Sequence, residues 1–286
     1  MITKKFRIGT FVFTLSYPEE FEPAENFLLF ETEEDTESTY FYNIELADHL
    51  PETEGIPAVT REDIVVLKNG TLENRVLGVK GNPLPYAYYH ETDEKHASVV
   101  FVKNRMEGLN IDPLFVSLLA LERRIVKHDG LILHCAYLDH NGEAVLFSAD
   151  SGTGKSTQAG LWEKYRPGSR QINGDKALLQ KVDGVWTARA WPVCGSSEIC
   201  RIQDTKIKAV VMLSQAKDNS AARLSPMQAF SLIYPQITCN RWNRKDNIHT
   251  MDLLDDLIAC IPVWHLACNI SEDAVKCLED SIDHVM

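Results

Sequence analysis

The chain has 286 residues, of which 44% are hydrophobic, and its formal net charge at pH 7 is -12. This length and apolar content suffice for a large core, with or without a smaller attached module. The negative charge disfavours a nucleic acid or an anionic membrane as partner, because no basic field exists to attract a polyanion. No apolar run approaches the roughly 20 residues that cross a bilayer, so we expect no membrane partner.

The beginning of the chain is typical of a strand and not of a targeting signal. Residues 1–15 alternate in polarity and lack an unbroken apolar segment or a small-residue cleavage site. The cysteines favour reduced thiols over disulfides or a zinc site, since their number is odd and no C-x-x-C pair occurs. We therefore expect a cytoplasmic protein. The seven cysteines are Cys135, Cys194, Cys200, Cys239, Cys260, Cys268 and Cys277.

Residues 1–110 are predicted to form a β-rich N-terminal module. Short runs that alternate or that are rich in β-branched and aromatic residues predict its strands. The dipeptide Asn69-Gly70 is a strong signal for a two-residue hairpin. The strand candidates are residues 6–15, 26–30, 63–68, 73–79, 86–89 and 97–102.

Near residue 110 the spacing of apolar residues changes from that of strands to that of a helix, which predicts a second domain, residues 111–286. Apolar residues recur at helical spacing from Asp112 to Lys127, with Pro113 in the first turn. Asn141-Gly142 ends another hairpin signal, which predicts that the following strand enters from an antiparallel pair. The later expectations are strands at 131–138, 143–148, 185–191, 207–213 and 263–267, and helices at 157–165, 226–233, 251–261 and 271–285.

A phosphate-binding loop is predicted at residues 149–157. The sequence Ala-Asp-Ser-Gly-Thr-Gly-Lys-Ser-Thr fits the pattern G-x-x-x-x-G-K-[ST] with Ala149 in the first glycine position. Small residues let backbone N–H groups surround a phosphate, and the following helix adds the positive end of its dipole. Lys155 is expected to reach the β- and γ-phosphates, and the Ser156 hydroxyl to bind Mg²⁺. The predicted nucleotide-binding residues are Ser151, Gly152, Thr153, Gly154, Lys155, Ser156 and Thr157.

Phosphoryl transfer also needs a carboxylate that holds the metal or acts as a base. The apolar strand at 207–213 ends in Ser214-Gln215 and offers no acid there. Asp175 is the better candidate, because it lies about twenty residues beyond the loop at the head of a predicted strand.

Three features in order, His134, the loop at 148–157 and Asp175, resemble the C-terminal catalytic domain of HPr kinase/phosphorylase. That family shares its nucleotide-binding core with phosphoenolpyruvate carboxykinases. The resemblance covers about residues 113–286 and is strongest at 131–176. It implies an α/β fold with a mixed-sheet P-loop core after the β-rich module, and transfer of a phosphoryl group from ATP, with Mg²⁺, to a hydroxyl.

The resemblance also implies residue roles. His134 would pair with Asp175 and tune its basicity, and Lys155 would complete the catalytic set. Ser156, Asp175 and Glu198 would bind the metal. Where the family carries two consecutive aspartates this chain has Gly174-Asp175-Lys176, so Asp175 is either a metal ligand or the base.

The acceptor is open. Thr157 replaces an acidic residue that often follows the loop serine in the family, and no segment resembles the family's loop for recognising a carrier protein. A serine or threonine of a peptide or protein, or a small molecule, is therefore the expected acceptor. The alternatives are a nucleotide-binding sensor without transfer activity, motivated by the single aspartate, and a carboxykinase-like enzyme on a small acid.

Two further residue sets have competing interpretations. Arg241 and Arg244 could neutralise a transferring phosphate, but a solvated basic loop is the simpler interpretation. Tryptophans at 186, 191 and 242 could border a pocket, although packing is the ordinary role of such side chains. The sequence leaves the oligomeric state open, a homo-oligomer included.

Overall fold

The computed structural model describes residues 1–105 and 112–283. The chain divides into two compact units, Met1–Arg124 and Ile125–Met286. The predicted domain boundary near residue 110 lies outside the described residues. Over the described helices, none is long and apolar enough to cross a membrane.

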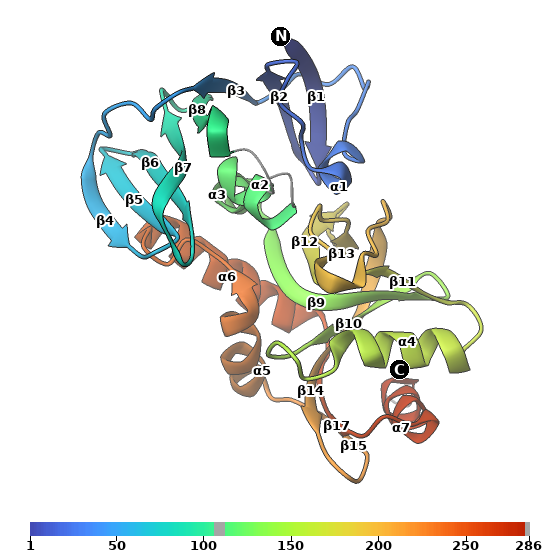
Figure 1. Cartoon of the computed structure of the whole chain (residues 1–286). Helices are drawn as coiled ribbons and strands as arrows, with labels where there is room; N and C mark the ends of the chain where they lie inside the picture. Colours follow the sequence, from blue (N-terminus) through green and yellow to red (C-terminus); the bar gives the residue numbers. More distant parts are fainter. Residues whose placement is uncertain (106–111, 284–286) are drawn as a thin grey trace. The chain divides into compact units, whose positions relative to one another are not determined.

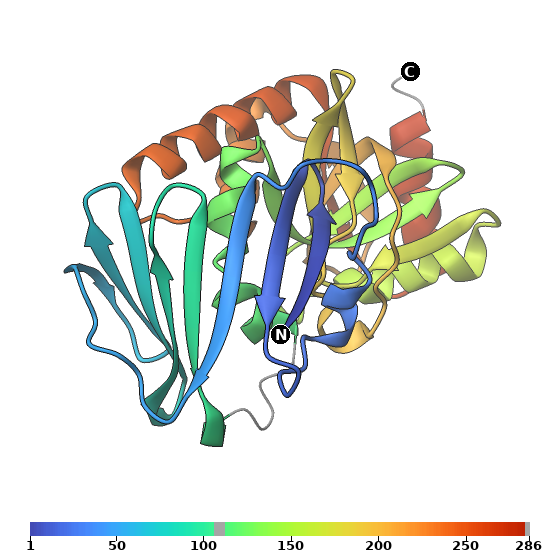
Figure 2. The same ribbon diagram turned by 90° about the horizontal axis from the view of Figure 1, so that it is seen from above.

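The first unit contains one eight-stranded mixed sheet, whose strands run side by side in Figure 2. The strand order is β1-β2-β3-β8-β7-β6-β5-β4, and β3 is parallel to both of its neighbours. The strands are β1 (Ile2–Ile8), β2 (Phe11–Tyr17), β3 (Tyr40–Ala47), β4 (Ile56–Thr60), β5 (Ile64–Asn69), β6 (Leu72–Val79), β7 (Asn82–Glu91) and β8 (His96–Val102). The helices that begin in this unit are α1 (Glu25–Leu28), η1 (Lys103–Arg105), α2 (Asp112–Leu118) and α3 (Leu121–Lys127).

The β-rich character of this unit and the hairpin at Asn69-Gly70 are confirmed, with Asn69 opposite Leu72. Two local predictions are wrong. The run at 6–15 is a hairpin of two strands, because Gly9 has a positive φ of 63° and turns the chain. The strand predicted at 26–30 is instead the short helix α1, whose Phe27 ring packs 4.6 Å from the rings of Phe6 and Phe115.

The helix predicted over 112–127 is present but broken. Its two halves, α2 and α3, meet at Ala120, which has a φ of 49° and ends the regular hydrogen-bond ladder. At the start of α3 three charged side chains contact the sheet: Glu122 accepts from Arg75, Arg123 donates to Glu91 and Arg124 donates to the Tyr89 hydroxyl.

A buried ion network joins α3 to β6 and β7 within this unit. The Glu91 carboxylate accepts from Arg123 Nε at 2.7 Å and from an Arg124 guanidinium nitrogen. It also accepts from the Tyr89 hydroxyl at 3.0 Å. Burial acts to raise the pKa of Glu91, but the two guanidinium groups outweigh it and lower the pKa, so the carboxylate stays ionised.

The second unit is built on a nine-stranded mixed sheet. Along the main path of the sheet, neighbouring strands follow the order β10-β9-β12-β13-β14-β17-β15. The strands are β9 (Leu131–His140), β10 (Glu143–Ser148), β11 (Ser169–Asn173), β12 (Lys176–Val182), β13 (Val185–Arg189), β14 (Thr205–Gln215), β15 (Ser220–Arg223), β16 (Ile237–Thr238) and β17 (Val263–Cys268). The helices are α4 (Lys155–Tyr165), η2 (Gly195–Ser197), α5 (Pro226–Ile233), η3 (Tyr234–Gln236), α6 (Arg244–Cys260) and α7 (Glu272–Asp283).

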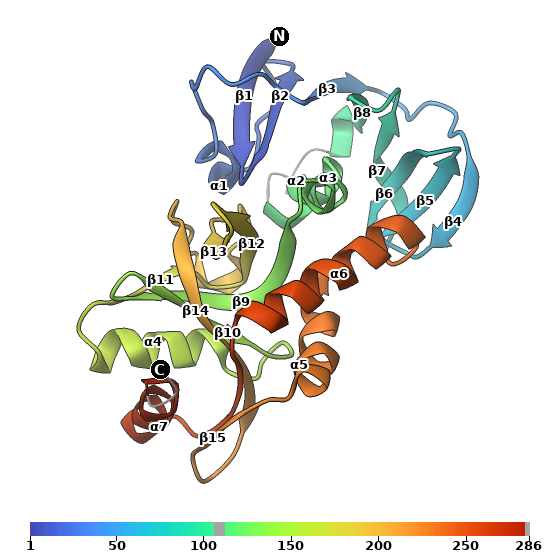
Figure 3. The same ribbon diagram turned by 180° about the vertical axis from the view of Figure 1, so that it is seen from behind.

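Helices cover both faces of this sheet, as Figure 1 shows for α4 and α7 on one side and α5 and α6 on the other. Residues of β10 alternate between the two cores. Leu146 packs in the core with Leu254 and Leu257 of α6, whereas Phe147 packs in the core with Trp162 of α4. Figure 3 shows α5 and α6 side by side on their face. The predicted mixed α/β architecture is confirmed.

Strand β10 lies between an antiparallel and a parallel neighbour. Its antiparallel partner is β9, as the hairpin signal predicts, and its parallel partner is β14. Strand β9 is shared more widely, since its first residues pair with β12 and β16 and its later residues with β10 and β11. This pairing places the end of β10 and the start of β12 beside the first half of β9, and these segments carry the candidate site.

Candidate functional site

A glycine-rich loop leaves β10 at Ser148 and enters α4 at Lys155. Gly152 and Gly154 have φ values of 81° and 115°, a region that favours glycine. Gly154 is the N-cap of α4. The predicted order of strand, loop and helix is confirmed, with α4 beginning two residues earlier than predicted.

Lys155 is a buried cation that faces backbone carbonyls. Its side chain points back into the loop, where Nζ donates to the carbonyl oxygens of Ala149 at 3.0 Å and Asp150 at 3.3 Å. The residue is 8% exposed. Among the described residues, no carboxylate oxygen lies within ion-pair distance of Nζ. Burial lowers the pKa of the Lys155 ammonium, because desolvation costs free energy when the group is charged.

The turn that carries Asp175 lies directly against the start of α4. The Ser156 hydroxyl donates to the Gly174 carbonyl at 3.2 Å. The Asn173 side chain shapes this turn, because its Oδ1 accepts from the backbone N–H groups of Asp175 at 2.9 Å and Lys176 at 3.0 Å. Asn173 is fully buried. No sequence motif identifies Asn173, since its role depends on local geometry.

Asp175 is held between two basic side chains. His134 Nε2 lies 3.5 Å from Asp175 Oδ1, and Lys176 Nζ donates to Oδ2 at 2.5 Å. Burial acts to raise the pKa of Asp175, but the contacts from His134 and Lys176 outweigh it and lower the pKa to about 2. The structure thus brings together His134 and Asp175, as expected, and adds a lysine.

The Lys176 contact bears on the chemistry open to Asp175. A carboxyl group with a pKa near 2 is a weak base, and one of its oxygens is engaged by an ammonium group. Such a carboxylate is well suited to hold positive charge, from a lysine or from a metal ion.

The η2 turn lies against Asp175 from another direction. A Cβ atom placed on Gly195 would lie 3.1 Å from Asp175 Cβ, so the Gly195 backbone lies close against the Asp175 side chain. Glu198, which caps η2, is exposed and has a φ of 55°. Over residues 1–105 and 112–283 no three His, Cys, Asp or Glu residues form a metal-binding cluster.

The remaining candidates are placed as follows. The Arg241 guanidinium stacks 5.1 Å from the Tyr234 ring centre, and Arg244 is the first residue of α6. Trp186 and Trp191 are buried, and Trp186 Nε1 donates to Asp256 Oδ2 at 2.9 Å, so packing explains both of these tryptophans.

A glutamine that is not among the predicted site residues also reaches the site. Gln236, the last residue of η3, contacts both His134 and the loop residue Asp150. It lies far from both in sequence, which is why no local pattern identifies it.

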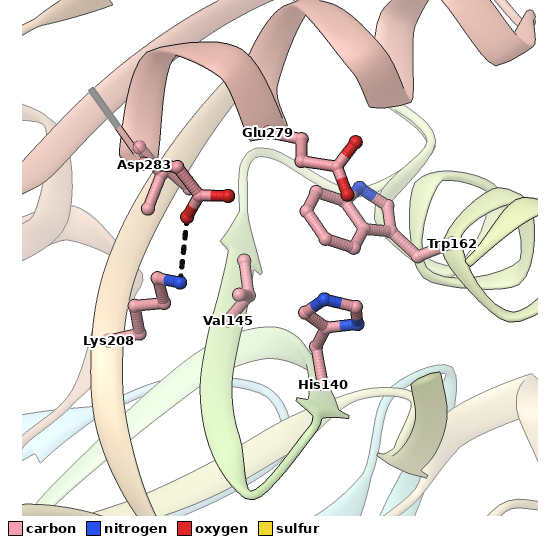
Figure 4. Close-up of a pocket in the computed structure, with 7 residues that line it drawn as sticks. His140, Val145, Trp162, Lys208, Glu279 and Asp283 are labelled. Atoms are coloured by element: carbon pink, nitrogen blue, oxygen red, sulfur yellow. Dashed lines mark hydrogen bonds and ion pairs between the residues drawn. The ribbon is translucent and has the colours of Figure 1, made fainter. Parts of the chain in front are cut away.

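A small pocket lies away from these residues (Figure 4). The ring of His140 meets Trp162 edge-on at 5.2 Å there, and Lys208 Nζ donates to Asp283 Oδ1 at 2.9 Å. None of the predicted site residues lines it. The lining residues are His140, Val145, Trp162, Lys208, Glu279, Ile282 and Asp283.

Replacement of Gly174 by alanine tests the packing that fixes the Asp175 turn. A Cβ atom at this position would overlap the Ser197 side chain, so we expect Gly174→Ala to lower the free energy of unfolding by about 1–3 kcal/mol. Removing the obstacle with Ser197→Gly should recover part of this loss in the double variant. Urea unfolding measures both effects.

The control for this prediction is Gly160→Ala in α4, where a Cβ atom has open space and alanine favours the helix. It should stabilise the protein by about 0.5–1 kcal/mol. Strictly additive losses in Gly174→Ala and Ser197→Gly would contradict the proposed overlap.

Fold and site together define an α/β protein whose mixed sheet carries a glycine-rich turn between strand and helix. The chain belongs to the family described as SynChlorMet cassette protein ScmC, whose model matches residues 101–281. No curated protein matches the chain.

Among solved structures, the chain is similar to the HPr(Ser) kinase/phosphatase from Coxiella burnetii at 10% sequence identity. The likeness covers 54% of this chain and 93% of the other, with a TM-score of 0.31. We base no statement about the fold on a TM-score this low.

Proposed function

We propose that residues 125–286 bind ATP and Mg²⁺ and transfer the γ-phosphoryl group to a hydroxyl of a peptide, a protein or a small molecule. In this proposal the loop from Ser151 to Thr157 holds the phosphates. Lys155 contributes positive charge, and Ser156, Asp175 and Glu198 supply oxygen ligands for the metal.

The observation that carries the proposal is the buried ammonium of Lys155. A cation that is 8% exposed and bonded to two carbonyl groups has lost most of its hydration without gaining a carboxylate partner. An anion at the loop would relieve this cost. The positive end of α4 begins at the same residue, so helix dipole and ammonium favour the same kind of ligand.

The residues near Ser156 fit a magnesium ion. Mg²⁺ takes oxygen ligands and needs only one or two carboxylates when phosphates and water complete its shell. The Ser156 hydroxyl contacts the carbonyl of Gly174, and the carboxylate of Asp175 follows in the next residue. When bound, the metal supplies charge neutralisation for the transferring group.

The contacts of Asp175 suggest which residue binds the metal and which accepts the proton. Its low pKa suits a metal ligand better than a proton acceptor, so we assign it to the metal. His134, whose Nε2 faces Asp175, is then the residue that accepts the proton of the attacking hydroxyl. Lys176 balances the carboxylate charge and gives way when another cation binds there.

A nucleotide-binding sensor is the second candidate. The observation that favours it is the same Lys176–Asp175 contact of 2.5 Å, which occupies an oxygen that a transferase would give to its metal. A sensor retains nucleotide binding and makes no phosphorylated product.

The two candidates separate in an assay with γ-labelled ATP, Mg²⁺ and pools of peptides and metabolites. If the protein is a kinase, the wild type labels an acceptor, and Asp175→Asn lowers the rate by at least about 100-fold. Asp183→Asn is the matched control, because Asp183 is an exposed turn residue with a φ of 50°, which asparagine tolerates. Binding of ATP without any labelled product would favour the sensor.

A further inference from the structure

The segment that follows α5 brings Gln236 to the site by backbone pairing. Gln236 ends η3 and is followed at once by β16, which pairs with β9 through Ile237 opposite Leu133. His134 is the next residue of β9. The sheet register therefore fixes Gln236 beside His134, across 102 residues of sequence.

The side chain of Gln236 forms a bridge between the glycine-rich loop and the imidazole. Its Nε2 donates to Asp150 Oδ1 at 2.8 Å, and its Oε1 lies 3.3 Å from His134 Nδ1. The bridge thus connects a residue of the loop to one that faces Asp175.

The chemistry of these groups sets the direction of each hydrogen bond. An ionised carboxylate only accepts, so the amide NH₂ group of Gln236 must face Asp150. The amide oxygen then faces His134, and Nδ1 must carry the proton that this oxygen accepts. The other nitrogen, Nε2, lies 3.5 Å from Asp175 Oδ1, which accepts from it once the imidazole has taken up a second proton there.

We propose that Gln236 is a positioning residue, which holds the His134 ring with Nδ1 as donor and Nε2 toward Asp175 and links that orientation to Asp150 in the loop. The inference rests on the proposed function, since it gives His134 its orientation for the transfer. Outer-shell partners that orient the side chains of a metal site commonly contribute about 10- to 100-fold to activity, and we expect the same range for the partner that orients His134.

The first test observes the imidazole directly. Nitrogen NMR of ¹⁵N-histidine-labelled protein resolves ring tautomers, and His134→Asn assigns the signal among the nine histidines. The wild type should show Nδ1 as the protonated, hydrogen-bonded nitrogen. Gln236→Ala should change the His134 signals. Gln236→Glu, which keeps an acceptor for Nδ1 but loses the donor to Asp150, should change them as well.

The second test separates positioning from binding. In Gln236→Ala, kcat for phosphoryl transfer should fall about 10- to 100-fold, while KM for ATP changes less than about 3-fold. Gln203→Ala is the matched control, because Gln203 Nε2 also donates to an aspartate, Asp139 Oδ2, at 2.7 Å. Asp139 lies at the other end of β9 from His134. The control should leave both the His134 signals and kcat unchanged.

The outcomes distinguish this inference from the proposed function. A wild type that makes no product contradicts the proposed function, and the spectra alone then decide whether Gln236 positions His134. His134 signals that stay the same in Gln236→Ala overturn the positioning role. An unchanged kcat in an active enzyme overturns it too.

Discussion

Lys155→Ala is expected to abolish measurable binding of Mg-ATP. The ammonium is buried at the start of α4, and its charge-assisted contacts to phosphate oxygens are each worth about 1.5–3 kcal/mol. Loss of two such contacts weakens binding by at least about 100-fold. Isothermal titration calorimetry measures this loss. Thermal unfolding provides a second readout, since ligand at 100 times Kd stabilises the wild type by about 2.7 kcal/mol.

The control is Lys164→Ala on the same helix. Lys164 is exposed and lies 4.7 Å from the Tyr165 ring, so its removal changes the net charge of α4 without touching the loop. This variant should bind Mg-ATP as the wild type does. Thermal stabilisation by Mg-ATP that persists in Lys155→Ala would show that the loop does not hold the phosphates.

Glu91→Gln is expected to destabilise the first unit by about 3–5 kcal/mol. Glu91 is 2% exposed and neutralises two guanidinium groups that are equally buried, Arg123 and Arg124. The glutamine keeps the size of the side chain but leaves the buried positive charges without this carboxylate. The variant therefore isolates the electrostatic contribution from the packing.

Hydrogen exchange measured by mass spectrometry locates this effect in the chain. Peptides from β3 and β7 should lose protection in Glu91→Gln, because Tyr40 and Tyr89 contact Arg124 there. Glu94→Gln, an exposed position in the turn before β8, is the matched control and should change nothing. Equal protection in Glu91→Gln and the wild type would mean that the ion network is not needed for stability.

The sequence was most informative where a local rule decides the structure. Asn69-Gly70 and Asn141-Gly142 both form hairpins, and Ser225-Pro226 opens α5 with a full capping box. The prediction was wrong at residues 26–30, because the apolar run Phe27 to Phe30 is too short to show a period that separates strand from helix. The break at Ala120, whose φ is 49°, falls within a continuous helical pattern of apolar residues, so the pattern does not reveal it.

The candidate site shows the same limit. The loop and its neighbours could be found from a motif, because spacing of glycine, lysine and serine has a direct physical meaning. Lys176 was visible as a departure from the resemblance, but only the structure shows that its ammonium contacts Asp175. Gln236 required knowledge of the β9–β16 register, which pairs residues more than a hundred positions apart.

A structure determined with Mg²⁺ and a non-hydrolysable ATP analogue would show whether the loop at residues 151–157 holds a nucleotide. We expect the β- and γ-phosphates at the backbone of Gly152 and Gly154, with the Lys155 ammonium turned from the carbonyl of Ala149 to a phosphate oxygen. The metal should bind Ser156, Asp175 and Glu198, with Lys176 displaced from the Asp175 carboxylate. A nucleotide bound elsewhere, or a loop that stays empty at saturating ligand, would contradict the proposed function.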